Sequence, residues 1–212
     1  MANTRQNLVF DGSIAPDVRG LTMVWEIRWH GRGGQGLVTA SSLLAEAALE
    51  EGKYIQAFPE FGPERMGAPI KAFNRISSRR IDVHSQVYEP NLVVVVDPTL
   101  LGLRDVVEGL REDGVLLANF GGGIEEVREK TGFSGSIYVV NATRIARETI
   151  GVPIANTACL GALARVVDVV KLDSLEKKFR ERFLDRFGEK GVEKNVEAMR
   201  RAYREVKGGA RG

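Results

Sequence analysis

Residues 31–36, GRGGQG, carry the clearest chemical signal in this sequence. Gly31, Gly33 and Gly36 match the spacing G-x-G-x-x-G, between a segment typical of a strand and a segment with helical spacing. Glycines in that setting let the backbone turn tightly and approach a phosphate, while the amides and dipole of the helix N-terminus attract its charge. The motif predicts an anion-binding turn, and the alternative is a tight turn that packs against a neighbouring subunit.

A dinucleotide site of this type also requires an acid at the end of the second strand, where it bonds the ribose. Glu60 lies 24 residues after Gly36, near the expected offset. It falls, however, inside a loop rich in proline and glycine and not at a clean strand end. The motif alone therefore leaves NAD(P) binding open.

That loop, EFGPERMGAP at residues 60–69, is the second chemical feature. Long irregular loops in compact domains tend to carry function. Arg65 could pair with a phosphate or a carboxylate, and the loop also resembles an interface or a ligand clamp. An internal ion pair between Glu64 and Arg65 on a solvated loop explains the same residues equally well.

The remaining polar candidates favour structural roles. His30 is expected to be a hydrogen-bonded histidine and Cys159 a small buried side chain. Asn156 opens a helix and is expected to cap it. The sequence shows no Ser-His-Asp set, no paired carboxylates in distinct settings and no nucleophile elbow, so it does not predict a catalyst that works alone.

Composition sets the outer limits of function. Thirty Lys and Arg against 28 Asp and Glu leave a net charge of +2, which argues against nucleic acid or an anionic membrane as the main partner. One cysteine excludes an intrachain disulfide and a four-thiolate iron–sulfur cluster held by this chain alone. Two histidines without a CxxC or HExxH pattern argue against zinc. No apolar run approaches the roughly 18 residues of a membrane span, and no signal core is seen, so a cytoplasmic protein is expected.

The elements around these motifs predict one domain. Residues 1–22 show no sustained period and are predicted to be a flexible extension, whereas residues 23–212 are predicted to form a single domain. Asp173 is a predicted N-cap and Gly188 a predicted C-cap. The predicted strands are 24–29, 54–58, 70–77, 81–88, 92–96, 114–119 and 136–140, and the predicted helices are 37–50, 99–109, 141–150, 156–170, 173–187 and 191–206.

This order predicts an α/β fold. Alternating strands and helices indicate a mostly parallel sheet, followed by a helical C-terminal segment. Residues 70–77 and 81–88 both alternate and are predicted to pair as antiparallel strands around the turn 78–80. The glycines 121–123 are expected to interrupt regular secondary structure between two predicted strands.

Three segments together resemble one family. WHGRGGQGLVTASSLLAEAALEEGKYIQAFPEFGPERMGAPIKAFNRIS (29–77) resembles the start of the gamma subunit of pyruvate:ferredoxin and related 2-oxoacid:acceptor oxidoreductases. LVVVVDPTLL (92–101) resembles its central strand, and NTACLGALARVV (156–167) with NVEAMRRAY (195–203) resembles its C-terminal helices. The resemblance covers about 24–206, and it implies a variant of the Rossmann fold. Where relatives often carry a second basic residue after the arginine of the loop, this chain has Met66.

The resemblance implies the oxidation of a 2-oxo acid, expected to be pyruvate, with CoA to an acyl-CoA, CO2 and reduced ferredoxin. Thiamine diphosphate and iron–sulfur clusters are then expected in partner alpha, beta and delta subunits, with ferredoxin reached through the complex. This chain is expected to bind no cofactor alone and to contact CoA at most. The residues expected to hold CoA phosphates or to form the wall of its channel are Gly31, Arg32, Gly33, Gly34, Gln35, Gly36, Glu64 and Arg65.

Three other functions remain compatible with the sequence. An independent NAD(P)-binding protein explains the glycine motif but gives the loop 60–69 no purpose. A purely structural scaffold would bind neither CoA nor NAD. A gamma-like subunit of an indolepyruvate oxidoreductase stays within the same reaction class.

Overall fold

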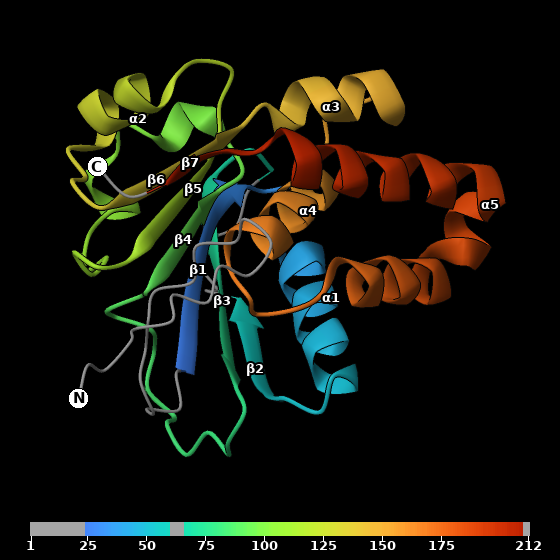
Figure 1. Ribbon diagram of the computed structural model, residues 1–212, viewed down its shortest axis with the longest axis horizontal. Coiled ribbons are helices and arrows are strands. Elements are labelled where there is room, and N and C mark those ends of the chain that lie inside the picture. Colours follow the sequence, from blue (N-terminus) through green and yellow to red (C-terminus); the bar gives the residue numbers. More distant parts are fainter. Residues whose placement is uncertain (1–23, 60–65, 210–212) are drawn as a thin grey trace, which may run out of the picture.

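One seven-stranded sheet forms the centre of the molecule (Figure 1). The computed structural model describes residues 24–59 and 66–209. Across the sheet the strands follow the order β2 (Tyr54–Pro59), β3 (Pro69–Ser77), β1 (Val24–Arg32), β4 (Leu92–Val95), β5 (Val115–Asn119), β6 (Ser136–Val140) and β7 (Lys207–Gly209).

The centre of the sheet is parallel and its two sides carry antiparallel strands. β1, β4, β5 and β6 pair in parallel. β3 pairs antiparallel with both β1 and β2, and β7 pairs antiparallel with β6. β4 and β5 are continuous runs of buried residues, as expected for strands covered on both faces. The predicted α/β fold of Rossmann-like type is confirmed.

Helices cover the two faces unequally. α1 (Leu37–Glu50), α4 (Asn156–Val166) and α5 (Leu172–Glu205) pack on one face and form the larger hydrophobic core, with α3 (Ala142–Thr149) against α5. α2 (Ile124–Thr131) and the short 3₁₀ turns η1 (Pro98–Leu100) and η2 (Arg104–Val106) contribute to the smaller core on the other face. No helix in the described residues is long and apolar enough to cross a membrane.

α5 is two antiparallel helices joined at Gly188. This residue has φ 65° and ψ 170°, outside the helical region, which confirms the predicted helix end. Arg200 binds Glu176 across the two halves at 2.6 Å. Gly161 of α4 lies against the backbone of Met199, so that a side chain at this position would overlap with the Met199 carbonyl. The glycine therefore sets how closely α4 and α5 approach.

The predicted strand pair 70–77 and 81–88 is wrong in its second member. Residues 81–88 form no strand, and β3 pairs with β2 and β1 instead. The side chain of Arg75 holds this segment against the sheet, donating to the carbonyls of Ser85 (2.7 Å) and Gln86 (3.0 Å). Of the apolar residues in this segment Val87 is buried, whereas Val83 and Tyr88 are exposed, so the alternation does not correspond to a buried strand face.

Other differences are local. The predicted helix 99–109 is two 3₁₀ turns, since Gly102 separates them and Gly109 has φ 69°. The helix predicted for 156–170 ends at Val166, because Val167 is extended. Asp173 is not the N-cap of α5, which is Lys171. α2 and β7 were not predicted: α2 buries only Val127, and β7 has three residues, so neither shows a period. The predicted extension 1–22 lies outside the described residues.

Candidate anion-binding site

The glycine motif lies where the parallel strands β1 and β4 end. Gly31 and Arg32 are the last residues of β1, Gly33 to Gln35 form the turn, and Gly36 immediately precedes α1. Because parallel strands present their carboxyl ends at one edge, this is the edge at which α/β sheets bind ligands. The structure therefore places the predicted loop in the predicted position.

Two glycines of the loop are required by close contacts. A side chain at Gly31 would lie 2.9 Å from Leu37 Cδ1, and one at Gly36 would overlap with the Asn156 amide. Gly36 also has φ 74°, in the left-handed region that favours glycine. Asn156 Nδ2 donates to the Gly36 carbonyl at 3.1 Å. Asn156 therefore holds the start of α1 and does not act mainly as the cap predicted from sequence.

Asp97, directly after β4, is the centre of the loop's hydrogen bonding. Its Oδ2 accepts from Gln35 Nε2 at 2.6 Å, and its Oδ1 accepts from the backbone amide (2.9 Å) and hydroxyl (2.6 Å) of Thr99. Burial alone would raise the pKa of Asp97, but the hydrogen bonds from Thr99 and Gln35 and the charge of Arg32 together hold this pKa below its usual value. Asp97 is therefore a carboxylate at neutral pH.

The side chain of Gln35 connects Asp97 to the backbone of the loop. Its Oε1 accepts from the Arg32 amide at 2.8 Å, while its Nε2 is held by Asp97. These two bonds fix both the position of the side chain and the orientation of its amide group. These bonds favour a structural role, in which Gln35 holds the loop in place, over the predicted direct contact with a ligand.

Arg32 presents a fixed cation beside the loop. Its Nη2 donates to Thr99 Oγ1 (2.9 Å) and its Nη1 to the Gly67 carbonyl (3.1 Å), while its Nε lies 3.4 Å from Asp97 Oδ2. The side chain is one third exposed. A guanidinium has five N–H groups, so donors remain that an anion in solvent can reach.

Several amides of the loop are already bonded within the chain. The Gly33 amide donates to the Ala68 carbonyl (3.0 Å), and the Gln35 amide donates to the Arg32 carbonyl (3.1 Å). No side chain caps the first turn of α1, so its leading amides have no partner within the helix. An anion would meet the start of α1 and Arg32, and not the glycine amides of a dinucleotide loop.

The strand order also removes the partner that a dinucleotide needs. In the NAD-type arrangement the second strand lies next to the first and carries an acid for the ribose. Here β3 lies between β1 and β2, with Arg32 opposite Pro69. The place of the ribose acid is taken by the start of an antiparallel strand. The arrangement thus does not support the NAD(P)-binding alternative.

The predicted site is only partly within the described residues. The six residues 31–36 come together as predicted, whereas Glu60, Glu64 and Arg65 lie outside the described residues. Sequence reasoning missed Asp97 and Thr99 as members of the site. The available signal was an acid directly after a buried apolar strand, at the edge where ligands bind.

The other polar candidates are structural. His30 is buried and accepts from Arg28 Nε at 3.0 Å, which confirms a hydrogen-bonded histidine. Burial, followed by the charge of Arg28, lowers the pKa of His30 to about 3. Burial raises the pKa of the Cys159 thiol to about 12, so that this cysteine is an inert core residue. The described residues contain no group of acids, histidines and cysteines that could hold a metal.

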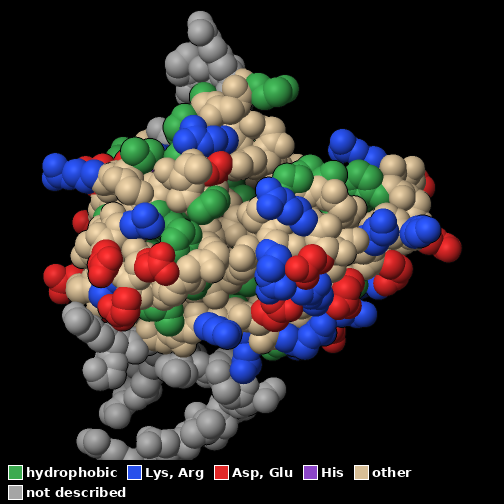
Figure 2. All heavy atoms as spheres, turned by 90° about the horizontal axis from the view of Figure 1, so that it is seen from above, with side chains coloured by type: hydrophobic (Ala, Val, Ile, Leu, Met, Phe, Trp, Pro, Cys, Tyr) green, Lys and Arg blue, Asp and Glu red, His purple; other side chains and the backbone are tan. Residues whose placement is uncertain are grey.

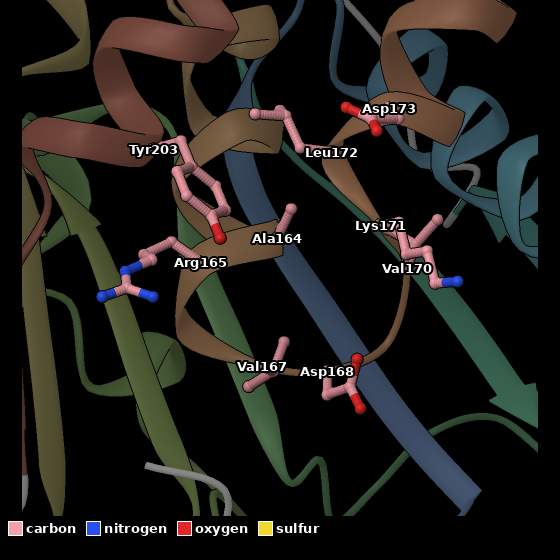
Figure 3. A pocket seen from close by; sticks show the side chains of 9 residues that line it. All are labelled: Ala164, Arg165, Val167, Asp168, Val170, Lys171, Leu172, Asp173 and Tyr203. Atoms are coloured by element: carbon pink, nitrogen blue, oxygen red, sulfur yellow. The ribbon is translucent and has the colours of Figure 1, made fainter. Parts of the chain in front are cut away.

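A separate cavity of about 440 Å³ lies between α4 and the two ends of α5. Figure 3 shows the Tyr203 hydroxyl pointing into it beside Arg165. Its charged lining residues are two bases and two acids: Arg165, Lys171, Asp168 and Asp173. This balance favours no ligand charge, so the glycine loop remains the stronger candidate.

Comparison with known protein families agrees with this geometry. The family model described as pyruvate ferredoxin/flavodoxin oxidoreductase matches residues 26–205. The PorC subunit of pyruvate synthase from Thermotoga maritima is 54% identical over 183 residues, 86% of this chain and 95% of that protein. The common gamma subunit of the pyruvate/ketoisovalerate oxidoreductases of Pyrococcus abyssi is 53% identical over 157 residues, 74% of this chain and 85% of that protein.

Solved structures show the same relationship. The crystal structure of the pyruvate oxidoreductase subunit PORC of Thermotoga maritima superimposes with a TM-score of 0.79 at 51% identity, over 87% of this chain and 98% of that chain. The 2-oxoglutarate:ferredoxin oxidoreductase of Magnetococcus marinus shares the fold, with a TM-score of 0.69 at 20% identity over 84% of this chain and 30% of that chain. The chain therefore belongs to the pyruvate ferredoxin/flavodoxin oxidoreductase family, as a gamma-type subunit of a 2-oxoacid:ferredoxin oxidoreductase.

Proposed function

We propose that this subunit holds the phosphate groups of CoA at the glycine loop, with Arg32 and the first turn of α1 as the contacts, while the enzyme oxidises pyruvate to acetyl-CoA. The observation that carries the proposal is the braced cation: Arg32 is fixed by Thr99 and Gly67, and part of its guanidinium faces solvent. A guanidinium held beforehand in position binds a phosphate without a further loss of side-chain freedom.

The relatives support a proposal for the substrate and the partners. Relatives that are about half identical are named as subunits of pyruvate synthase or pyruvate/ketoisovalerate oxidoreductases, so pyruvate is the proposed 2-oxo acid. The proposed partners are the alpha, beta and delta subunits, with ferredoxin as the electron acceptor. The proposed location is the cytoplasm. Thiamine diphosphate and the iron–sulfur clusters belong to the partners in this proposal. The single cysteine here, Cys159, is fully buried and cannot contribute to a surface cluster site.

The test is steady-state kinetics of the assembled enzyme with Arg32→Ala and Arg32→Lys. Loss of one charged contact to phosphate corresponds to about 1.5–3 kcal/mol, so the KM for CoA should rise by roughly 10- to 150-fold. The KM for pyruvate should stay unchanged. Lys keeps the charge but not the fork, so it should recover only part of the loss.

Arg111→Ala is the matched control. Arg111 is an exposed arginine paired with Asp113 on the surface, and its loss should change neither KM. Equal CoA kinetics in the Arg32 variants and the control, with assembly intact, would contradict the CoA contact.

A further inference from the structure

The glycines 121–123 line a cavity of their own, with a volume of about 520 Å³. A cavity of this size is within the range of small-molecule sites. β5 ends at Asn119 and β6 at Val140, and both strand ends border the cavity. It therefore lies at the carboxyl edge of the parallel strands, where α/β folds bind ligands. None of its lining residues belongs to the glycine loop 31–36, so it is a separate site.

The backbone of the loop 121–123 offers free donors to this cavity. The amides of Gly121 and Gly122 have no hydrogen-bond partner among the described residues. The next amide, that of Gly123, donates to Glu126 Oε1 at 3.0 Å. A side chain at Gly122 would overlap with the Glu126 carboxylate and with the ring of Phe120. Glycine amides between a strand and a helix are a common cradle for a phosphate group.

Basic side chains give the same cavity a positive charge. Arg144, Arg204 and Lys207 line it, together with a single acid, Glu205. Glu205 is already paired with Arg144 at 2.6 Å, so these two charges offset each other. The other two cations leave the lining with a net positive charge, which favours an anionic ligand.

Arg204 and Lys207 both keep donors that a ligand can reach. Arg204 Nη2 donates to Glu197 at 3.0 Å, but the side chain is 60% exposed and its other N–H groups have no partner in the described part of the chain. On the face seen in Figure 2, many Lys and Arg side chains lie beside Asp or Glu. Lys207, by contrast, has no ion-pair partner among the described residues. A guanidinium fork and an ammonium group next to free amides are suited to a phosphate group.

The remaining lining indicates more than a bare ion. It includes four apolar side chains, those of Phe120, Ile124, Val139 and Val140. An inorganic anion would leave this surface without a contact, whereas an organic body attached to the phosphate would cover it. The described residues that line the cavity include no His, Cys, Ser, Thr or Tyr, which favours binding over a reaction.

We propose that this cavity binds a small organic phosphate other than CoA. The phosphate group lies at the amides of Gly121 and Gly122 and is contacted by Arg204 and Lys207, while the organic body packs on the apolar lining. The proposal does not depend on the CoA contact at Arg32, because the two sites share no residue.

The test is titration of the full-length chain with phenyl phosphate, followed by NMR of the backbone amides. The titrated chain carries Arg32→Ala, so that the cation of the glycine loop does not contribute to binding. Arg204→Ala and Lys207→Ala are then added one at a time, and Arg111→Ala, a change at an exposed ion pair, is the control. Inorganic phosphate and benzoate are titrated as comparison probes. Thermal unfolding checks that each variant is folded.

Phenyl phosphate should bind at one saturable site and shift the amide signals of Gly121 and Gly122. Each cavity variant should weaken this binding by roughly tenfold or more, and the control should not. Inorganic phosphate lacks the organic body and benzoate lacks the phosphate, so both should bind more weakly. The absence of saturable binding, equal binding of all three probes, or affinities unchanged in both cavity variants would overturn the proposal. In the wild-type chain an equal concentration of CoA should leave the phenyl phosphate in place, and its displacement would overturn a ligand other than CoA.

Discussion

Exchanging Asp97 and Gln35 tests whether their hydrogen bond shapes the glycine loop. In the native protein Gln35 Nε2 donates to Asp97 Oδ2 at 2.6 Å. In Asp97→Asn the new side-chain amide faces Gln35 Nε2 either with its NH2 group, which is a second donor, or with its oxygen, which is a neutral and weaker acceptor. If Gln35 turns over to match it, its Oε1 no longer accepts from the Arg32 amide. Gln35→Glu places two carboxylates against each other. The double variant restores a donor opposite an acceptor, and the carboxylate introduced by Gln35→Glu can still accept from the Arg32 amide.

The size of the effect follows from the groups left unpaired. A hydrogen bond to a charged group contributes about 1.5–3 kcal/mol, and an unsatisfied buried donor costs about 1–3 kcal/mol. Asp97 is buried and accepts three short bonds, and Asp97→Asn can keep those from Thr99. We therefore expect each single variant to lower the free energy of unfolding by about 2–3 kcal/mol, and the pair to show a coupling of about 1–2 kcal/mol in the double variant.

Urea unfolding of the isolated chain, followed by circular dichroism, measures these free energies, and hydrogen exchange of a peptide spanning residues 31–40 reports on the loop. Asp113→Asn is the control, because its pair with Arg111 is exposed on both sides and should contribute at most about 1 kcal/mol. Additive single variants, or unchanged exchange at the loop in Asp97→Asn, would refute the reasoning.

Two further changes test other parts of the structure. Burial and the charge of Arg28 lower the pKa of His30 to about 3. The neutral His30 therefore contributes to stability fully above about pH 6.5, and this contribution is lost as the pH falls towards 3. His30→Gln should reduce the slope of unfolding free energy against pH in that range by up to roughly 1.4 kcal/mol per pH unit, and an unchanged slope would contradict the lowered pKa. Gly161→Ala should lower the melting temperature strongly, because its methyl group overlaps with the Met199 carbonyl at a cost of about 1–3 kcal/mol or more. Gly102→Ala is the control, because its methyl group meets open space and should leave the melting temperature unchanged. Equal melting temperatures of the two variants would show that α4 and α5 separate easily.

Much of the fold could be predicted because its elements obey local rules. α1 begins and ends at the predicted residues, since its apolar spacing and the glycines on both sides are visible in the sequence. β4 is a short, continuous apolar run rich in valine, which favours a strand buried on both faces. The segment 81–88 was misjudged because its apolar residues alternate without a shared buried face: Val83 and Tyr88 are exposed, and only Val87 is buried.

The site was predictable in its backbone and not in its side chains. The glycine spacing identified the turn, because close packing and a positive φ restrict those positions to glycine. The bond between Gln35 and Asp97 joins residues 62 positions apart, and no local pattern indicates it. The same holds for Asn156, which reaches Gly36 across 120 positions. Such pairs depend on which strands become neighbours, and the sequence of one chain does not state that.

Strand order also explains why a glycine motif of dinucleotide type serves a different purpose here. With β3 between β1 and β2, the turn has an antiparallel neighbour whose chain supplies the Ala68 carbonyl for the Gly33 amide. That bond occupies an amide that would otherwise face a pyrophosphate. The acid at the edge is Asp97, and it faces inward to Gln35 and Thr99 and not outward to a ribose. A motif that could bind a whole nucleotide is thereby reduced to a rigid turn, one cation and one helix N-terminus. If the proposed CoA contact holds, these groups would meet the phosphates of the ligand and not its base or ribose.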